Sequence, residues 1–338
     1  MKFIHLADCH LGDRFDFTSG LSNQIRKNNK KSLENILAKN SDIDFLLIAG
    51  DLYERSLFTL KDYKELFHKI ADFGKDIFYV AGNHDYIGEG NETIFKMKPD
   101  NLHIFSNHNL EYYEINSSRI YGLSYNDRIY EREFSYDIKL DDNYFNILIA
   151  HATVNNPEGN YLNLDLEKLK KIGFDYVALG HIHKWEDFGN NIYYSGAIEP
   201  SDFSDIYDYG YIIYNDGEIT HIDSSIMKFY DLKLSLDDFK NEDEELIAYI
   251  KSILKTDKGN YLRLKVDGNI NKKKIKNELN LSYFELEIDE DSTLYDMVNL
   301  YPNSLLDKYM EKFPKNTDKL HKRALELGLD AIYRSRDE

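Results

Sequence analysis

The chain has few of the residues that would point to a secreted or membrane protein. It contains a single cysteine, so it forms no internal disulfide, and Cys9 is expected to fill a buried gap rather than to bind a metal. No apolar run approaches the roughly 18 residues of a membrane span, and no basic-then-apolar signal pattern opens the chain. The expectation is a cytoplasmic globular protein with no membrane partner.

Positive charge is also scarce. The chain carries 42 lysines and arginines against 60 aspartates and glutamates, which gives a net charge of −18. Proteins that hold nucleic acid through its phosphates usually present a basic surface, so tight duplex binding by this chain alone is not expected. Three clusters of basic residues are predicted to be solvated helix faces rather than DNA contacts. They are Arg26, Lys27, Lys30 and Lys31; Lys168, Lys170 and Lys171; and Lys272 to Lys274 with Lys276.

Five apolar runs in the first 185 residues each end in residue types that bind metals. Short apolar runs closed by Gly or a polar cluster predict buried strands: FIHLADCHLG, FLLIAGD, IFYVAGNHD, NILIAH and DYVALGHIH. The loops that leave the carboxyl ends of strands in an open α/β sheet converge, so the residues ending these runs are expected to share one site. They are Asp8, His10, Asp51, Asn83, His84, Asp85, His151, His181 and His183.

The ligand types indicate the metal. Carboxylate, amide and imidazole donors without a thiolate suit a borderline-to-hard divalent ion, with Mn²⁺ first and Fe²⁺, Zn²⁺ or Mg²⁺ as alternatives. The set is larger than one four- to six-coordinate ion needs, so two ions are the simpler interpretation. A bridging carboxylate would offset the repulsion between two dications roughly 3.5–4 Å apart. A water shared by the ions would lose its proton near neutral pH and become the nucleophile.

In order, these pieces resemble the complete signature of the calcineurin-like metallophosphoesterases: Asp8-x-His10, Gly50-Asp51, Gly82-Asn83-His84-Asp85, His151 and Gly180-His181-Ile182-His183. Each piece is weak alone, but all five in order make a strong signal. Within that superfamily, HLADCHLG, GHIHKWE and YSGAIEP resemble the Mre11/SbcD group of DNA repair nucleases, and its short bacterial members most closely. The resemblance is strong over residues 1–225 and mostly architectural beyond them.

The resemblance implies a role for each motif residue. One ion would be held by Asp8, His10, Asp51 and His183, and the other by Asp51, Asn83, His151 and His181, so that Asp51 bridges. His84 would donate to the phosphoryl oxygen or the leaving group, and Asp85 would orient the His84 imidazole and keep it protonated.

The activity that the resemblance implies is hydrolysis of phosphodiester bonds in DNA ends or single strands, by exonuclease or endonuclease action. An ABC-type ATPase of the Rad50/SbcC kind would be the partner, and relatives form homodimers. One position departs from archaeal members of the group, which tend to carry a histidine, associated with exonuclease action, three residues after the GD aspartate. Glu54 stands there instead, which argues against processive exonuclease activity. Glu54 is expected to be a solvated loop residue.

The element pattern predicts an α/β fold, and two facing sheets with helices outside would make a four-layer αββα sandwich, as the resemblance also implies. Strands at 2–6, 45–50 and 77–82 alternate with helices, which predicts parallel strands with right-handed crossovers. Residues 102–105, 111–115 and 119–124 are expected to be strands of a second sheet. Asp216-Gly217 predicts a hairpin between two further strands.

Three segments are predicted beyond the individual elements: a two-metal phosphoesterase domain over 1–227, a small α+β capping domain over 228–290, and a C-terminal helical segment over 291–338. Apolar stripes through Leu305 to Phe313 and Leu320 to Leu327 indicate the last two helices. Such stripes usually pack against the chain's own core, whereas the resemblance implies docking on the ATPase.

Two other functions stay open. The acidic surface suits a small-molecule phosphodiesterase or phosphatase on the same fold. A regulatory subunit that docks on an ATPase would leave the metal site vestigial, although the intact ligand set argues against that. Tyr125, Tyr130 and Tyr136, near Arg128 and Arg132, could stack on unpaired bases, but Tyr is abundant along the whole chain.

Overall fold

The computed structural model describes residues 1–12, 19–204, 206–239, 243–267 and 270–288, together with Lys308 and Gly328. The chain divides into two units, Met1–Phe229 and Tyr230–Glu338. The helices predicted within 291–338 lie outside the described residues.

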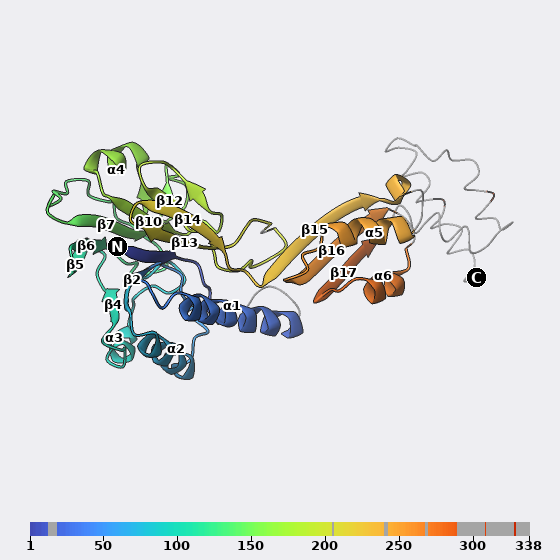
Figure 1. Ribbon diagram of the computed structural model, residues 1–338, viewed down its shortest axis with the longest axis horizontal. Coiled ribbons are helices and arrows are strands. Elements are labelled where there is room, and N and C mark those ends of the chain that lie inside the picture. The colour runs from blue at the N-terminus through green and yellow to red at the C-terminus, as the bar shows by residue number, and fades with distance from the viewer. Residues whose placement is uncertain are drawn as a thin grey trace. The chain divides into compact units, whose positions relative to one another are not determined.

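Two six-stranded sheets form the first unit (Figure 1). The first sheet contains, in spatial order, β14 (Glu218–Asp223), β13 (Gly210–Asn215), β1 (Lys2–Leu6), β2 (Phe45–Ala49), β3 (Asp76–Val80) and β4 (Leu102–Phe105). The second contains β11 (Glu186–Asp187), β12 (Ile192–Tyr194), β10 (Tyr176–Gly180), β7 (Phe145–His151), β6 (Ser118–Gly122) and β5 (Glu111–Ile115). Both sheets are mixed, because their central strands run parallel and antiparallel strands close one or both edges.

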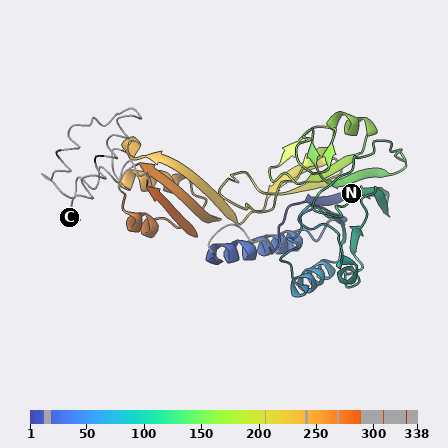
Figure 2. The same ribbon diagram turned by 180° about the vertical axis from the view of Figure 1, so that it is seen from behind.

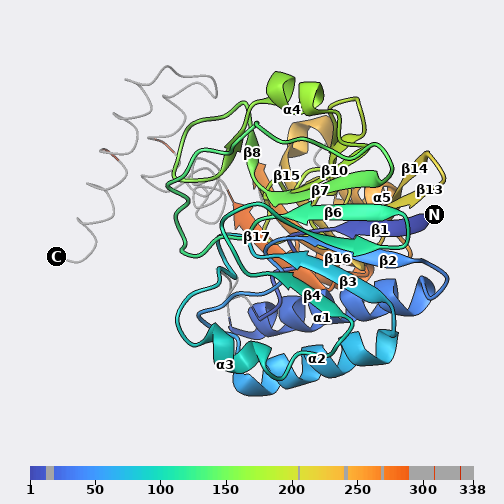
Figure 3. The same cartoon turned by 90° about the vertical axis from the view of Figure 1, so that its left-hand side faces the viewer.

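The sheets pack face to face, and helices cover their outer faces (Figures 2 and 3). Helices α1 (Ser19–Lys39) and α2 (Leu60–Phe73) lie on the first sheet, and α4 (Leu166–Ile172) lies on the second. In β2, Phe45 and Leu47 face the second sheet, while Leu46 and Ile48 face the helices. A strand covered on both faces is apolar at nearly every position, which explains the long apolar runs of the sequence.

Local signals fix the ends of α2. Its first turn carries a capping box, in which the Thr59 side chain accepts from the Asp62 backbone N–H and the Asp62 carboxylate accepts from the Thr59 backbone N–H. The helix ends at Gly74, which has a left-handed φ of 70°. Buried Leu66 and Ile70 present the apolar face to the sheet.

One strand assignment was wrong. Residues 102–105 were expected in the second sheet, but β4 pairs parallel with β3 at the edge of the first sheet. The short helix α3 (Asn91–Phe95) makes the crossover between β3 and β4. Four residues with one half-buried position look alike in either sheet, so the crossover rather than the strand pattern decides the placement.

The second unit contains one three-stranded sheet with helices packed on it among its described residues. The strands are β15 (Met227–Ser235), which begins in the first unit, β16 (Gly259–Asp267) and β17 (Tyr283–Ile288), and β16 and β17 run parallel. The 3₁₀ helix η1 (Leu236–Phe239) and the helices α5 (Asp243–Ile253) and α6 (Lys272–Glu278) connect them. Leu246, Ile250 and Ile275 of the helices pack against Leu262 and Leu264 of β16.

In the described part of the chain, no helix is long and apolar enough to cross a membrane. Lys30, Lys168, Lys170 and Lys274 pair with carboxylates of their own or a neighbouring helix, as expected of solvated helix faces.

Candidate metal centre

The predicted ligands lie just beyond the carboxyl ends of strands from both sheets. On the first sheet, Asp8 and His10 follow β1, Asp51 follows β2 and Asn83 follows β3. On the second sheet, the ligands are His151, which ends β7, and His181 and His183, which follow β10. Parallel strands deliver their carboxyl ends to one edge, so residues up to 175 positions apart in the chain gather there.

The backbone is strained at four of the seven predicted metal ligands. Asp8 has a φ of 51°, His10 of 46°, Asp51 of 51° and His181 of 100°. Side chains other than glycine rarely adopt this left-handed region, and the cost is of order 1–3 kcal/mol for each residue. Strain of this kind concentrates at functional sites, where the position of a side chain matters more than its backbone preference.

Gly180 brings the two sheets together beneath the ligands. A Cβ at this position would overlap the carbonyl oxygen of Ala49 in the first sheet and would come within 2.8 Å of the Ala7 Cβ. Only glycine permits this approach, which explains the residue before His181 in the motif.

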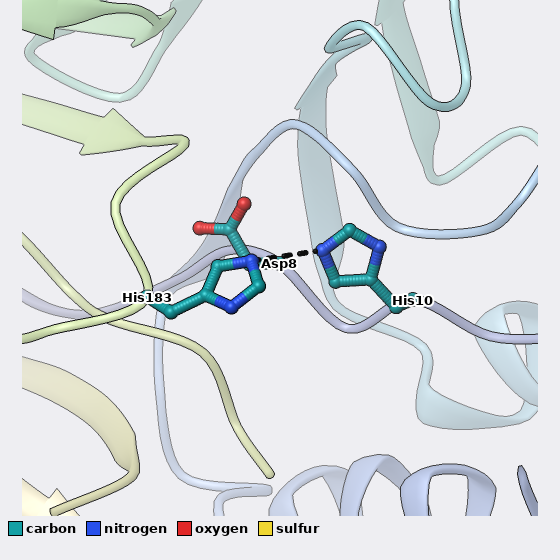
Figure 4. A group of neighbouring side chains, drawn as sticks. All are labelled: Asp8, His10 and His183. Atoms are coloured by element: carbon teal, nitrogen blue, oxygen red, sulfur yellow. Dashed lines mark hydrogen bonds between the residues drawn. The ribbon is translucent and has the colours of Figure 1, made fainter. Parts of the chain in front are cut away.

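Asp8, His10 and His183 form one group of potential metal ligands (Figure 4). The Nε2 atoms of His10 and His183 are 3.2 Å apart, and the Asp8 carboxylate accepts the backbone N–H of His181 at 3.1 Å. Asp8 and His10 are 2% and 6% exposed. Two imidazole nitrogens and a carboxylate that converge within this distance suit one divalent ion.

Asp51 belongs to two further groups, one with Asp8 and His151 and one with His10 and His84. His151 Nε2 lies 3.2 Å from Asp51 Oδ2 and 3.1 Å from Asn83 Oδ1. His181 Nδ1 lies 3.3 Å from the same His151 nitrogen. The Asp51 carboxylate therefore lies between the two sets of ligands that the resemblance implies.

The atoms facing one another are mostly acceptors, which is the arrangement that a cation satisfies. His151 Nδ1 donates to the Ala49 carbonyl at 3.0 Å, so Nε2 is the atom that faces the oxygens of Asp51 and Asn83, and it can offer them no lone pair without a cation between them. His10 Nδ1 is buried and has no hydrogen-bond partner among the described residues. These donors fit divalent metal ions.

Electrostatics support the same conclusion. Burial lowers the pKa of His10 and of His181 to about 3, so both rings stay neutral and able to bind a metal. Burial also opposes charge on His151, but the facing Asp51 carboxylate outweighs it and raises the His151 pKa to about 9. In the metal-free protein the proton between His151 and Asp51 therefore takes the place of a cation, and metal binding would displace it.

His84 has a different carboxylate neighbour from the expected one. Its Nδ1 lies 2.7 Å from Glu54 Oε2, and the Glu54 side chain is only 15% exposed, so Glu54 is not a solvated loop residue. Burial opposes ionisation of Glu54, but hydrogen bonds from His84 and Ser56 outweigh it and lower the Glu54 pKa to about 2. Glu54 is recognisable in the sequence by its place three residues after Asp51, but its contact with His84 depends on the tertiary structure.

Asp85 serves the backbone instead. Its carboxylate accepts hydrogen bonds from the backbone N–H groups of Leu52 (2.6 Å), Gly82 (2.6 Å) and Asp51 (3.2 Å), and from the Tyr79 hydroxyl (2.6 Å). The expected orientation of His84 by Asp85 is therefore corrected. Asp85 is fully buried and ties the loop after β2 to the loop after β3, so it positions ligands from both loops.

The tyrosines suggested for base stacking are unsuited to it. Tyr125 and Tyr130 are 1% and 8% exposed, and the Tyr136 hydroxyl accepts the Asp165 backbone N–H at 2.7 Å. The ring of Tyr161, which is exposed, lies 4.4 Å from the His181 ring, centroid to centroid, and Trp185, also exposed, follows His183 by two residues. In the sequence, the tryptophan of GHIHKWE indicates such an exposed ring, because it closely follows the last ligand motif.

With this geometry in place, comparisons identify the class of protein. The sequence profile of the calcineurin-like phosphoesterase family matches residues 1–185, which is more than half of the chain. The chain therefore belongs to the calcineurin-like phosphoesterase family, and it is a metallophosphoesterase with a candidate metal site.

The chain is similar to a metallophosphoesterase and to a DNA repair protein. The chain is 30% identical over 243 residues to the uncharacterized metallophosphoesterase YhaO of Bacillus subtilis, covering 65% of this chain and 59% of that protein. It is 28% identical over 215 residues to the DNA double-strand break repair protein Mre11 of Methanocaldococcus jannaschii, covering 59% of this chain and 57% of that protein. The chain thus spans less than two thirds of the length of either relative.

Proposed function

We propose that this chain is a two-metal phosphodiesterase that cleaves DNA ends or single strands, as a nuclease of the Mre11/SbcD type. The observation that carries the proposal is the convergence of carboxylate, amide and imidazole donors from both sheets around Asp51. The similarity to the archaeal Mre11 protein supports DNA as the substrate.

The ligand assignment is part of the proposal. Asp8, His10 and His183 would hold one ion and Asn83, His151 and His181 the other, with Asp51 shared. In support, Asp8, His10 and His183 form one group of converging donors, and the Asp51 and Asn83 oxygens both face His151 Nε2. When bound, the ions would supply Lewis-acid activation of the phosphodiester and of an attacking water.

The chain's own residues would complete the site around that chemistry. His84 shares a group of converging atoms with Asp51 and His10, and its backbone N–H donates to Asp51 Oδ1 at 2.9 Å. Its side chain is 29% exposed, so it remains accessible to a substrate. We propose that His84 donates a hydrogen bond or proton to the phosphoryl group, with Glu54 rather than Asp85 orienting the ring.

The proposed partner is an ABC-type ATPase of the Rad50/SbcC kind. A chain with a net charge of −18 needs help to hold a polyanion, and a partner could supply the missing phosphate contacts. We further propose that 228–290 is a capping domain and that 291–338 docks on the ATPase. A homodimer remains part of the proposal by analogy with relatives.

The test is cleavage of labelled single-stranded and hairpin-ended DNA by the full chain with Mn²⁺. His84→Ala is the test variant, and His68→Ala is the matched control, because the His68 side chain is 79% exposed on α2. Wild type and His68→Ala are expected to cut DNA, whereas His84→Ala is not. Turnover of bis-p-nitrophenyl phosphate by the wild type, measured in parallel, reports the metal centre without DNA binding.

A small-molecule phosphodiesterase is the second candidate, because the net charge of −18 favours it. Hydrolysis of bis-p-nitrophenyl phosphate with all DNA left intact, also after the ATPase is added, would contradict the nuclease and support this candidate. Failure on both substrates with Mn²⁺ bound would contradict phosphodiesterase activity altogether and would support a regulatory subunit.

A further inference from the structure

An exposed aromatic patch follows the last metal-ligand motif in the first unit. Trp185, two residues after His183, is 38% exposed, and Tyr207 and Ile206 are 39% and 59% exposed. The Lys184 ammonium lies 5.9 Å from the centroid of the Tyr207 ring, and Lys228 donates to the Tyr207 carbonyl at 3.0 Å. We call these five residues the aromatic-basic patch.

The backbone that carries Trp185 is fixed by close packing. Gly196 has a left-handed φ of 74°, and a Cβ there would lie 2.8 Å from the His183 carbonyl oxygen and 2.9 Å from the Trp185 nitrogen. The backbone N–H of Ala197 donates to the same His183 carbonyl at 3.0 Å. The indole ring lies 5.5 Å from the His221 ring, centroid to centroid. The loop that presents the ligand His183 therefore also carries Trp185, whose indole packs beside His221.

We propose that the aromatic-basic patch binds an unpaired nucleotide of the strand being cut, with its base stacked on Trp185. This inference rests on the proposed nuclease function and names its substrate class. Aromatic faces beside lysines are the combination that binds single strands, because every base offers a flat face and every linkage a phosphate. A base pair inside a duplex has both faces covered by its neighbours and cannot stack on the indole.

Stacking matters here more than charge. Lys228 also faces the Asp208 carboxylate at 3.4 Å, so part of its charge is already neutralised. The chain as a whole carries a net charge of −18, which weakens attraction to any polyanion. Contact between flat apolar surfaces does not depend on net charge, so it supplies affinity that the acidic surface does not. The substrate class that follows is DNA with at least one unpaired base near the scissile bond.

Trp185 is the only tryptophan in the chain, so its fluorescence reports this subsite directly. The wild-type full chain is titrated with oligothymidylate and with an abasic oligonucleotide of the same length, in EDTA so that neither strand is cut. The two strands carry the same phosphates and differ only in bases. We expect oligothymidylate to quench the indole emission and to bind about five- to a hundred-fold more tightly for each base stacked, whereas the abasic strand leaves the emission unchanged.

Two variants separate stacking from general loss of structure, with binding followed by anisotropy of a labelled strand. Trp185→Leu is expected to bind both strands with the same, weaker affinity. Tyr112→Leu is the matched control, since Tyr112 is 51% exposed on the outer strand β5, and it is expected to prefer oligothymidylate as the wild type does.

Each result decides one question. Equal binding of both strands by the wild type, or an unchanged preference in Trp185→Leu, overturns the stacking proposal and leaves the patch to a protein partner. That result does not touch the nuclease if the wild type still cuts DNA with Mn²⁺. If the wild type binds and cuts neither strand while it hydrolyses bis-p-nitrophenyl phosphate, the nuclease assignment fails and the stacking proposal fails with it.

Discussion

Glu54 Oε2 lies 2.7 Å from His84 Nδ1, so two motif loops meet through a carboxylate and an imidazole beside the metal ligands. Ser56 holds the other Glu54 oxygen through its hydroxyl at 2.7 Å, which fixes the carboxylate before any substrate arrives. The His84 ring is therefore held through Nδ1, and its Nε2 lies on the side of the ring away from Glu54.

Glu54→Gln should test this contact. The amide keeps the shape and one hydrogen bond but removes the negative charge that favours a cationic ring. We expect bis-p-nitrophenyl phosphate turnover to fall about 10- to 100-fold, as for other residues that orient a catalytic or ligating histidine, with little change in metal content. Glu92→Gln, at an exposed position of α3, is the control. An unchanged kcat and pH profile would show that Glu54 only packs there.

His84→Ala removes the proposed hydrogen-bond donor. The expected result is a loss of roughly 10²–10⁴-fold in kcat with both metals retained, because the side chain is proposed to contact the substrate and not the ions. Elemental analysis of the purified variant gives the metal content. Loss of one metal ion from the variant would make His84 a ligand and contradict the proposed role.

Asp85→Asn should loosen both loops. The carboxylate accepts four hydrogen bonds, and an amide has one acceptor oxygen and an NH₂ group that would face N–H donors. Leaving buried donors unsatisfied costs about 1–3 kcal/mol for each group, so the free energy of unfolding should fall by at least that amount. Urea unfolding of the metal-free protein measures it. Asp137→Asn, at an exposed position, should stay within about 0.5 kcal/mol of the wild type.

Gly180→Ala is expected to weaken metal binding. The added methyl group overlaps the Ala49 backbone, so the sheets have to separate at the edge where their ligands meet. We expect weaker Mn²⁺ binding by calorimetry and a loss of about 1–3 kcal/mol in the free energy of unfolding from overpacking. Gly189→Ala is the control, since a Cβ there meets nothing, although its φ of 75° costs up to about 1 kcal/mol. Equal Mn²⁺ affinity in the two variants would contradict the prediction.

His5 should make the fold sensitive to mild acid. It is fully buried between the sheets, where Nδ1 lies 3.1 Å from the Tyr176 hydroxyl and Nε2 lies 3.1 Å from the Leu179 carbonyl oxygen. Burial lowers the His5 pKa to about 3, while the unfolded chain keeps the ordinary value of about 6.5. The unfolded state therefore binds the extra proton, and stability that is complete above pH 6.5 falls as the pH drops toward 3.

The His5 contribution amounts to about 4–5 kcal/mol across that window. His5→Gln does not titrate, so the difference in unfolding free energy between wild type and variant should shrink as the pH falls. Urea unfolding at several pH values between 7 and 4 measures it. Parallel pH profiles for the two proteins would show that His5 does not carry this dependence.

The sequence predicted most of the fold because strands buried on both faces are nearly continuous apolar runs, as FLLIA of β2 and YVALG of β10 are. It failed for β4, since membership of a sheet depends on pairing with a distant strand and not on four residues of pattern. The ligands could be predicted because they follow those strands directly. The contact between Glu54 and His84 could not, because it joins two irregular loops whose shapes depend on Asp85 and the tertiary packing around it.

The left-handed backbone at Asp8, His10, Asp51 and His181 affects which substitutions the chain can accept during evolution. Glycine at any of these positions would relieve local strain, so some substitutions that abolish ligation should raise the melting temperature of the metal-free protein. Selection for stability alone would then erode the centre one donor at a time. When a metal ion is bound, losing a ligand is destabilising instead, because the ion stabilises only the folded state and binds more weakly after each loss. Metal supply in the cell thus becomes a condition for keeping the motif.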